Sequence, residues 1–249
     1  MKPAFTASLP EPFPYRDFQE ALKRLKTAMT RGPAYALLLG ESGTGKTTLL
    51  RTLSAALDRQ RFQVLYLCHG QPSPTGLTRV LADALHLPLR RSRAETSRLL
   101  VQTLRDLPSR LLFWIDEVQL IREETLHEIR LLAEANLNGP PLFSVVLSAL
   151  PELKDRLLAP QLFPLWRRIS VRVTLTGLVR DEVASFLAHL LGKEAAARFA
   201  PEALAMIFER ARGVPAQVHS LATECLKARP QGPISAENVG EALDGMDET

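Results

Sequence analysis

The stretch Tyr35-Ala-Leu-Leu-Leu-Gly-Glu-Ser-Gly-Thr-Gly-Lys-Thr-Thr48 decides the fold of this chain. It opens with a continuous apolar run, which is typical of a strand buried in a parallel sheet. Residues 40–47 then match the pattern G-x-x-x-x-G-K-[ST], whose glycines let the backbone curl around phosphate oxygens. Leu50, Leu53 and Leu57 follow at helical spacing. The order of strand, loop and helix therefore predicts a phosphate-binding loop on an α/β sheet.

The residues of this loop and of the first helical turn are the expected nucleotide-binding residues. They are Gly40, Glu41, Ser42, Gly43, Thr44, Gly45, Lys46, Thr47 and Thr48. In such loops the lysine reaches the β- and γ-phosphates and the hydroxyl residue after it binds Mg²⁺. Lys46 and Thr47 are expected in these two roles, with ATP and Mg²⁺ as cofactors.

Two adjacent carboxylates follow a second apolar run. Leu111-Leu-Phe-Trp-Ile115 predicts a buried strand, and Asp116 and Glu117 come directly after it. In open α/β sheets ligands bind at the carboxyl ends of the strands. Asp116 is therefore expected in the Mg²⁺ shell with Thr47, and Glu117 as the group that polarises the attacking water. The pair favours ATP hydrolysis over phosphoryl transfer to a small molecule.

The remaining apolar periodicity indicates two regions. Strands are expected at residues 35–39, 64–67, 111–115, 143–147 and 169–173, and helices at 17–30, after Lys46, at 77–87, at 94–107 and around 126–133. This alternation predicts a parallel sheet flanked by helices. After Thr176-Gly177 the spacing becomes helical throughout, which predicts four helices and no strand. We expect an α/β nucleotide-binding domain at residues 1–176, with a proline-broken arm at 1–15, and a helical lid at 177–249.

Composition excludes several other classes of protein. The 249 residues are 46% apolar and 23% charged, so a sizeable core is expected. No apolar run approaches the roughly 18 residues that cross a bilayer, and the proline-rich N-terminus lacks a secretory pattern. Two cysteines make neither a disulfide framework nor a metal site. A cytoplasmic protein without a membrane partner is expected, and its net charge of +4 permits a polyanionic partner.

Beyond these two motifs, the sequence resembles the AAA+ ATPases. Within them it resembles the ExeA-type branch, which includes transposition ATPases of the TniB, MuB and TnsC kind. The motifs that carry the resemblance are Gly-Glu-Ser-Gly-Thr-Gly-Lys-Thr at 40–47, Ile-Asp-Glu-Val-Gln at 115–119, Ser-Ala-Leu-Pro-Glu-Leu at 148–153, Leu-Trp-Arg-Arg-Ile at 165–169 and Gly-Val-Pro at 213–215. The resemblance implies a P-loop AAA+ core with a five-stranded parallel sheet and a C-terminal helical lid.

The resemblance also implies roles for single residues. Ser148 matches the polar sensor that orients the lytic water, although a serine that caps the next helix is an equal alternative. Arg167 or Arg168 lies where the family has an arginine finger that reaches a neighbouring subunit, although a surface arginine pair is the alternative. His69 lies where the family has a polar residue that couples the ligand state to Glu117, although a structural histidine is the more common alternative.

One position departs from the family pattern. The family has an arginine directly after the proline of Gly-x-Pro, where this chain has Ala216. Arg212 is a candidate substitute. We expect that the lid and the nucleotide are weakly coupled and that hydrolysis by the isolated monomer is weak.

The densest basic cluster contains Arg90, Arg91 and Arg93, in a loop between two expected helices. These side chains would contact the phosphates of double-stranded DNA without selecting a sequence, although a solvated loop is the alternative. The favoured hypothesis is an ATP-dependent regulator of transposition that assembles with itself on DNA as a ring or filament. It would recruit a transposase, and in some systems a further transposition protein. Two alternatives stay open: an ExeA-like secretion-assembly ATPase, disfavoured by the end of the chain at Thr249, and a scaffold that binds ATP without hydrolysing it.

Overall fold

The computed structural model describes residues 11–67, 72–136 and 139–247. Within them the chain divides into two compact units. The first comprises Ala21–Gly40 and Thr47–Thr174, and the second comprises residues 11–20, Glu41–Lys46 and 175–247. The second unit thus combines C-terminal helices with two short segments from the N-terminal part of the sequence. The linear division at residue 176 stays a prediction.

A five-stranded parallel sheet forms the centre of the first unit. Its strands are β1 (Tyr35–Gly40), β2 (Phe62–Leu67), β3 (Arg110–Ile115), β4 (Ser144–Ala149) and β5 (Ile169–Leu175). They lie in the order β2-β3-β4-β1-β5. The register pairs Leu38 with Ser148 and Tyr66 with Trp114. The predicted α/β class and the five parallel strands are confirmed. The central strands β1, β3 and β4 are buried almost throughout, whereas the edge strands β2 and β5 are partly exposed.

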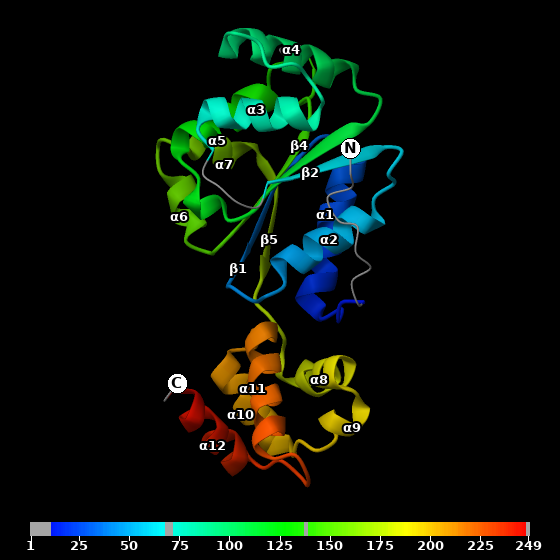
Figure 1. Cartoon of the computed structure of the whole chain (residues 1–249), viewed down its shortest axis with the longest axis vertical. Coiled ribbons are helices and arrows are strands. Elements are labelled where there is room, and N and C mark those ends of the chain that lie inside the picture. The colour runs from blue at the N-terminus through cyan, green and yellow to red at the C-terminus, as the bar shows by residue number, and fades with distance from the viewer. Residues whose placement is uncertain (1–10, 68–71, 137–138, 248–249) are drawn as a thin grey trace. The chain divides into compact units, whose positions relative to one another are not determined.

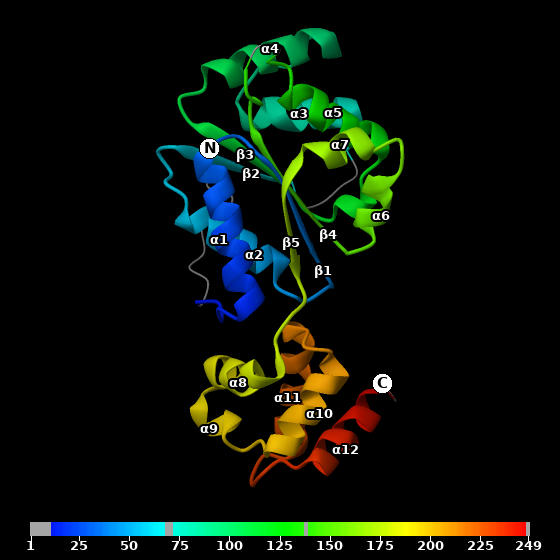
Figure 2. The same ribbon diagram turned by 180° about the vertical axis from the view of Figure 1, so that it is seen from behind.

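Helices cover both faces of this sheet. They are α1 (Arg16–Arg31), α2 (Lys46–Ala56), α3 (Pro74–Ala84), α4 (Arg93–Asp106), α5 (Glu123–Ala133), α6 (Leu153–Leu158) and α7 (Phe163–Arg168). In Figures 1 and 2, α2 lies on one side of the sheet and α5, α6 and α7 lie on the other. Alternate strand residues such as Leu37, Phe113 and Leu147 pack in one core with Ile129 and Leu157 of the latter helices.

The second unit contains the helices that follow β5 in the sequence. They are α8 (Val183–Leu191), α9 (Lys193–Ala196), α10 (Pro201–Ala211), α11 (Pro215–Ala228) and α12 (Ala236–Asp247), together with a 3-10 turn, η2 (Arg180–Glu182). The prediction of four helices missed the one-turn helix α9, which is too short to show a periodic pattern. The prediction of no strand is confirmed for the described residues after Gly177, where Phe199 and Ile234 form only an isolated parallel bridge.

Two further differences lie in the first unit. The short helices α6 and α7 were not predicted. Helix α3 begins at Pro74, where the Ser73 hydroxyl accepts the Gly76 N–H, and ends at Ala84. The sequence had placed its end at Leu87, but His86 adopts a left-handed φ of 54°, so the chain leaves the helix before Pro88. No helix in the described ranges is long and apolar enough to cross a membrane.

Candidate nucleotide-binding site

The glycine-rich loop has a curled backbone that depends on its glycines. Gly43 and Gly45 have φ angles of 82° and 93°, which side chains other than glycine rarely adopt. Lys46 begins α2, so the loop leads into a helix N-terminus, where anions bind favourably. The Lys46 Nζ donates to the Glu41 carbonyl at 3.0 Å, and the Thr44 hydroxyl donates to the same oxygen at 2.8 Å. The loop is therefore formed, with its lysine folded over it.

The other loop residues have simpler surroundings. Gly40 is the last residue of β1. The side chains of Glu41 and Ser42 are exposed, as is that of Thr48, which lies in the first turn of α2. Exposed residues on both sides of the curled backbone leave it open to a ligand from solvent.

Two contacts within the second unit hold the backbone of the loop. The Tyr15 hydroxyl donates to the Thr44 carbonyl at 2.5 Å. Burial, aided by the charges of nearby acidic residues, raises the pKa of Tyr15 far above its ordinary value, so the phenol stays a donor. The Ala216 N–H, at the start of α11, donates to the Gly43 carbonyl at 3.2 Å. A Cβ added at Gly43 would lie 2.7 Å from the Cβ of Ala216. Position 216 therefore contacts the loop backbone directly.

The expected pair of metal ligands meets in the first unit. The Thr47 hydroxyl donates to the Asp116 Oδ2 at 3.2 Å, although the two residues lie far apart in the sequence. The Tyr66 hydroxyl, from β2, donates to the same oxygen at 3.2 Å. The Tyr66 ring packs on the Trp114 ring with centroids 4.1 Å apart. One carboxylate oxygen is thus held by two hydroxyl groups at the carboxyl edge of the sheet.

These oxygens fit Mg²⁺. In the described parts of the chain, no group of three or more His, Cys, Asp or Glu side chains could hold a metal. Mg²⁺ does not need such a cage, since it is usually bound by one or two protein oxygens, waters and substrate phosphates. Thr47 and Asp116 offer two oxygens of this kind, and Thr47 directly follows the glycine-rich loop in the sequence.

Glu117 follows Asp116 in an unusual backbone conformation. Its φ is 52° and its ψ is 42°, in the left-handed region, and its side chain is exposed. The Glu117 N–H donates to the Asp116 Oδ1 at 3.1 Å. Strained backbone of this kind clusters at functional sites, where it sets the direction of a side chain. The backbone therefore turns sharply at Glu117, directly after Asp116.

Ser148 lies inside β4, one residue before the strand ends, and is fully buried. Its hydroxyl has no hydrogen-bond partner among the residues that the structure describes. A buried hydroxyl without a partner is unusual. The alternative of a serine that caps the next helix is not what the contacts show, since neither α6 nor α7 has a side-chain cap.

The two arginines at the end of α7 differ. The Arg168 Nε lies 2.9 Å from the Glu134 Oε1, in an ion pair within the same chain. Arg167 is exposed, and its side chain makes no hydrogen bond or ion pair with the described residues. Of the two, Arg167 is the one available to another molecule.

The three arginines between α3 and the start of α4 also differ in their contacts. Arg90 and Arg91 are exposed, and their side chains make no ion pair within the part of the chain that is described. Arg93 is the first residue of α4 and forms an ion pair with Glu128 of α5. His69, the remaining expected residue, lies outside the described residues.

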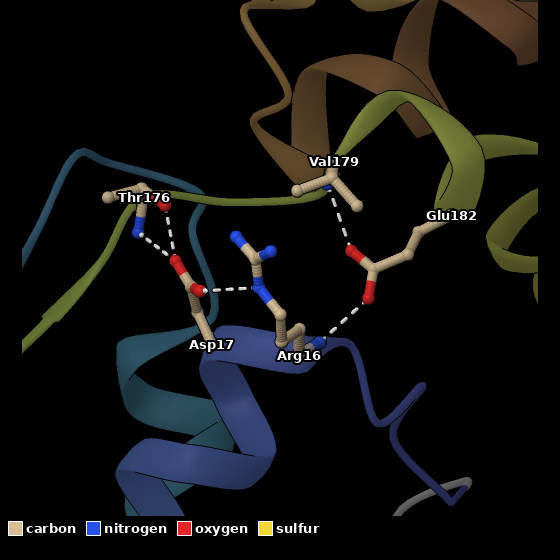
Figure 3. Close-up of polar contacts among 5 residues, drawn as sticks. All are labelled: Arg16, Asp17, Thr176, Val179 and Glu182. Atoms are coloured by element: carbon tan, nitrogen blue, oxygen red, sulfur yellow. Dashed lines mark hydrogen bonds and ion pairs between the residues drawn. The ribbon is translucent and has the colours of Figure 1, made fainter.

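Residues 16 and 17 connect the N-terminal segment of the second unit to residues 176–182 of the same unit (Figure 3). The Arg16 N–H donates to the Glu182 Oε1 at 2.7 Å, and the other Glu182 oxygen accepts the Val179 N–H at 2.9 Å. Asp17 accepts the N–H of Thr176 at 3.2 Å and also its hydroxyl. Tyr15, which holds the loop, directly precedes this set of contacts.

The residue that was expected to replace the missing lid arginine is also in the second unit. Arg212 ends α10 with a left-handed φ of 48° and is exposed. Its guanidinium makes no hydrogen bond or ion pair with the described chain, so its role as a substitute stays a prediction.

Sequence reasoning missed Tyr66 and Tyr15. Tyr66 lies one residue before the end of β2, and its contact with Asp116 depends on the register of β2 against β3. Tyr15 lies in a segment that was expected to be only a proline-broken arm. A single tyrosine, near a strand end or in a proline-rich segment, is a weak sequence pattern. The roles of both residues could therefore be recognised only from the tertiary structure.

The fold and the loop define a P-loop α/β nucleotide-binding domain. Comparison with known protein families identifies the family of this domain. Residues 29–157 match the AAA domain family, and the chain belongs to that family. The predicted AAA+ core is thereby confirmed, whereas the resemblance to transposition ATPases is not shown.

A protein of known sequence is similar to most of the chain. General secretion pathway protein A of Aeromonas hydrophila is 28% identical over 218 residues, which cover 84% of this chain and 39% of that protein. The chain thus spans well under half of the length of this relative.

Solved structures share the fold. The Aeropyrum pernix ORC2 protein superimposes with a TM-score of 0.66 at 16% identity, covering 98% of this chain and 72% of that chain. Drosophila ORC, in a structure bound to DNA, gives a TM-score of 0.67 at 17% identity, with 94% and 61% covered.

Proposed function

We propose that this chain is an ATPase that binds DNA and regulates transposition in the cytoplasm. Subunits loaded with Mg-ATP assemble as a ring or helical filament on duplex DNA, select a target and recruit a transposase, in some systems with a further transposition protein. Hydrolysis then releases the assembly. The observation that carries the ATPase part is the hydrogen bond between Thr47 and Asp116, together with the positive φ of Gly43 and Gly45 in the loop that precedes Thr47 in the sequence.

The chain's own residues would divide the chemistry among them. The loop amides and the Lys46 Nζ would hold the phosphates, and Thr47 and Asp116 would hold Mg²⁺. The bound metal supplies neutralisation of phosphate charge. Glu117, whose exposed side chain leaves the strand on a strained turn, would accept the proton of the attacking water. The Ser148 hydroxyl would orient that water, which would give this buried group a partner.

Arg167 would act as the arginine finger toward a neighbouring subunit. Its side chain makes no hydrogen bond or ion pair in the described part of its own chain, whereas Arg168 is paired with Glu134. An arginine supplied in trans stabilises transition-state charge and contributes about 10³–10⁵ in rate in other phosphoryl-transfer enzymes. The isolated monomer would therefore hydrolyse slowly, as the alanine at position 216 also suggests.

Binding and hydrolysis of ATP are tested first. Calorimetry with Mg-ATP should show uptake by the wild-type chain and none by Lys46→Ala. Phosphate release should be lost in Glu117→Gln, which should still bind Mg-ATP. If the wild-type chain takes up no Mg-ATP, the proposal is wrong. Uptake without phosphate release at any protein concentration would favour the non-hydrolysing scaffold.

A mixing experiment tests the finger. Arg167→Ala retains Glu117, and Glu117→Gln retains Arg167, so each alone should be inactive. Mixed subunits should regain hydrolysis, because one supplies the finger to the other's site. Arg168→Ala should lose far less activity than Arg167→Ala. Recovery that is absent from the mixture, while the two proteins co-assemble, would contradict a finger in trans.

The DNA contacts are tested by replacing Arg90 and Arg91 with alanine. Each lost phosphate contact should reduce the salt slope of binding by about 0.9, with a similar loss on every sequence. Arg93→Ala should have less effect because that side chain is paired with Glu128. Arg59→Ala, an exposed arginine elsewhere in the same unit, serves as the matched control. Unchanged DNA affinity in the double variant would remove these residues from the proposal.

Secretion assembly is a second candidate, favoured by the similarity to general secretion pathway protein A. The two candidates differ in their partner. Electron microscopy of the chain with ATP and linear duplex DNA should show subunits arrayed along the DNA if it acts in transposition. Absence of any assembly on DNA, with Mg-ATP uptake intact, would favour the secretion candidate.

A further inference from the structure

The turn that carries Glu117 is held by residues outside the nucleotide motifs. After Glu117 the chain forms a single 3-10 turn, η1 (Val118–Leu120). The Leu120 N–H donates to the Glu117 carbonyl at 2.9 Å, and the Ile121 N–H donates to the Val118 carbonyl at 3.0 Å. Such a short turn offers few hydrogen bonds to stabilise a left-handed glutamate. Other groups must therefore hold it.

Arg156 supplies the missing support from α6. Its Nη1 donates to the Gln119 carbonyl at 3.0 Å and its Nη2 donates to the Ile121 carbonyl at 2.6 Å. The guanidinium is planar and rigid, so its two donors fix the relative positions of both carbonyls. These carbonyls flank Leu120 and are among those that the end of a 3-10 turn leaves without partners. Arg156 thus closes the turn two residues after Glu117.

A second bond ties the same turn to the strand that bears Ser148. The Gln119 Oε1 accepts the Leu150 N–H at 3.4 Å, just beyond the end of β4. Leu153 of α6 and Val118 belong to one core cluster. The turn after Asp116, the end of β4 and α6 therefore form one connected group in the first unit.

Helix α6 also packs on α7, which presents Arg167. Both helices lie on the same side of the sheet in Figures 1 and 2. Arg156, on α6, therefore connects the turn that carries Glu117 to the helix pair that carries the free arginine. Arg156 forms no ion pair with the described residues. Its Nη1 and Nη2 donate to two backbone carbonyls instead.

We propose that Arg156 is a positioning residue for hydrolysis, which clamps the Glu117 turn onto the α6–α7 helix pair. This inference rests on the proposed ATPase function. It predicts that Arg156 affects the rate of the chemical step and not the uptake of nucleotide, because neither of the carbonyls it binds belongs to the phosphate-binding loop or to the metal ligands.

The first experiment compares Arg156→Met, Arg156→Lys and a control, Lys154→Met, on the same helix. Lys154 is exposed and its side chain makes no hydrogen bond or ion pair with the described residues. We expect Arg156→Met to lower kcat by about 10- to 100-fold, the scale of a misplaced catalytic group, with an unchanged Kd for Mg-ATP. Millimolar guanidinium should restore part of the lost rate in Arg156→Met. Arg156→Lys, with one point charge, should regain only a part.

The opposite outcomes would overturn the inference. An unchanged kcat in Arg156→Met contradicts it, and so does a loss of Mg-ATP affinity that accounts for the whole effect. A similar loss of kcat in Lys154→Met would also do so. If Arg156→Met does not fold, Arg156→Lys gives the same separation of kcat from Kd.

A second measurement does not depend on hydrolysis. Amide exchange of Leu120 and Ile121 in the ligand-free chain should be at least about tenfold faster in Arg156→Met than in wild type, because the clamp that closes the turn is gone. Unchanged exchange would contradict the clamp even if turnover fell. If the wild-type chain hydrolyses no ATP, the proposed function fails, while the exchange data still decide whether Arg156 holds the turn.

Discussion

The phosphate-binding loop and the turn after Asp116 both contain backbone with positive φ, but they reach it with different residues. The loop uses Gly43 and Gly45, for which these angles cost little. The turn uses Glu117, for which a left-handed conformation costs about 1–2 kcal/mol. The difference teaches that the shape of the loop follows from residue type, whereas the turn keeps a needed carboxylate in a conformation that only its neighbours can hold.

Glu117→Gly should have the largest effect and tests the strain in the turn. Turnover should fall by about 10²–10⁴, the usual contribution of a general base. The free energy of unfolding should nevertheless rise by up to about 1 kcal/mol, because glycine adopts this φ without strain. Phosphate release and urea unfolding measure the two quantities. Glu117→Gln is the control, with the same loss of turnover and no gain in stability. A Glu117→Gly variant no more stable than wild type would show that the turn is not strained.

Gly43→Ala breaks the loop at the position that contacts α11. Besides the unfavourable φ of 82°, the new Cβ would lie 2.7 Å from the Cβ of Ala216. A strain of about 1–3 kcal/mol corresponds to an affinity for Mg-ATP about 5- to 150-fold weaker. Gly232→Ala is the matched control, with a φ of 81° and no close neighbour. Equal Mg-ATP binding by the two variants would mean that the loop tolerates a side chain here.

Gly45→Ala should have a smaller effect, because only the backbone is strained. The nearest atom to its added Cβ is the Tyr15 hydroxyl oxygen at 3.8 Å, an ordinary contact. About 1–2 kcal/mol of strain gives an affinity for Mg-ATP about 5- to 30-fold weaker. Gly192→Ala, with a φ of 91° and open space around it, should lower stability without changing that affinity. Calorimetry separates these outcomes, and full affinity in Gly45→Ala would contradict the role of residue type in the loop.

Tyr66→Phe should have the smallest effect and tests how far the turn depends on distant residues. It removes one hydrogen bond to Asp116 and keeps the ring that packs on Trp114. A net bond of about 0.5–1.5 kcal/mol corresponds to a half-saturating Mg²⁺ concentration about 2- to 10-fold higher for turnover. Tyr35→Phe is the control, since the Tyr35 hydroxyl is buried with no hydrogen-bond partner in the described chain. The same Mg²⁺ dependence in all three proteins would remove Tyr66 from the site.

The central strands β1, β3 and β4 were predictable because each is a run of apolar residues that the sheet buries on both faces. The edge strands β2 and β5 were also predicted, although they are partly exposed. The helices α6 and α7 were not, since six residues are too few to show a helical period. The start of α3 shifted because Ser73 caps it, and its end shifted because His86 takes a left-handed turn that no local pattern indicated. Long periodic elements were thus predicted, and short or irregular ones were not.

The candidate site divides in the same way. The positions of Lys46 and Thr47 follow from a contiguous motif, and that of Asp116 from the end of an apolar run. The difference between Arg167 and Arg168 could not be predicted, because it depends on Glu134, which precedes β4 and lies 34 residues before Arg168 in the sequence. Arg167 and Arg168 are equivalent in the sequence motif, and they differ only because Arg168 pairs with Glu134 from another part of the chain.

The sequence by itself determined the conformation of residues 40–47 and the place of the acidic pair, because glycine stereochemistry and apolar runs act through neighbours along the chain. Only the tertiary structure decided that Tyr66 holds Asp116, that Ala216 touches the loop and that Arg156 closes the turn after Glu117. Each of these contacts joins segments far apart in the chain, and the packing of strands and helices alone brings such segments within hydrogen-bond distance.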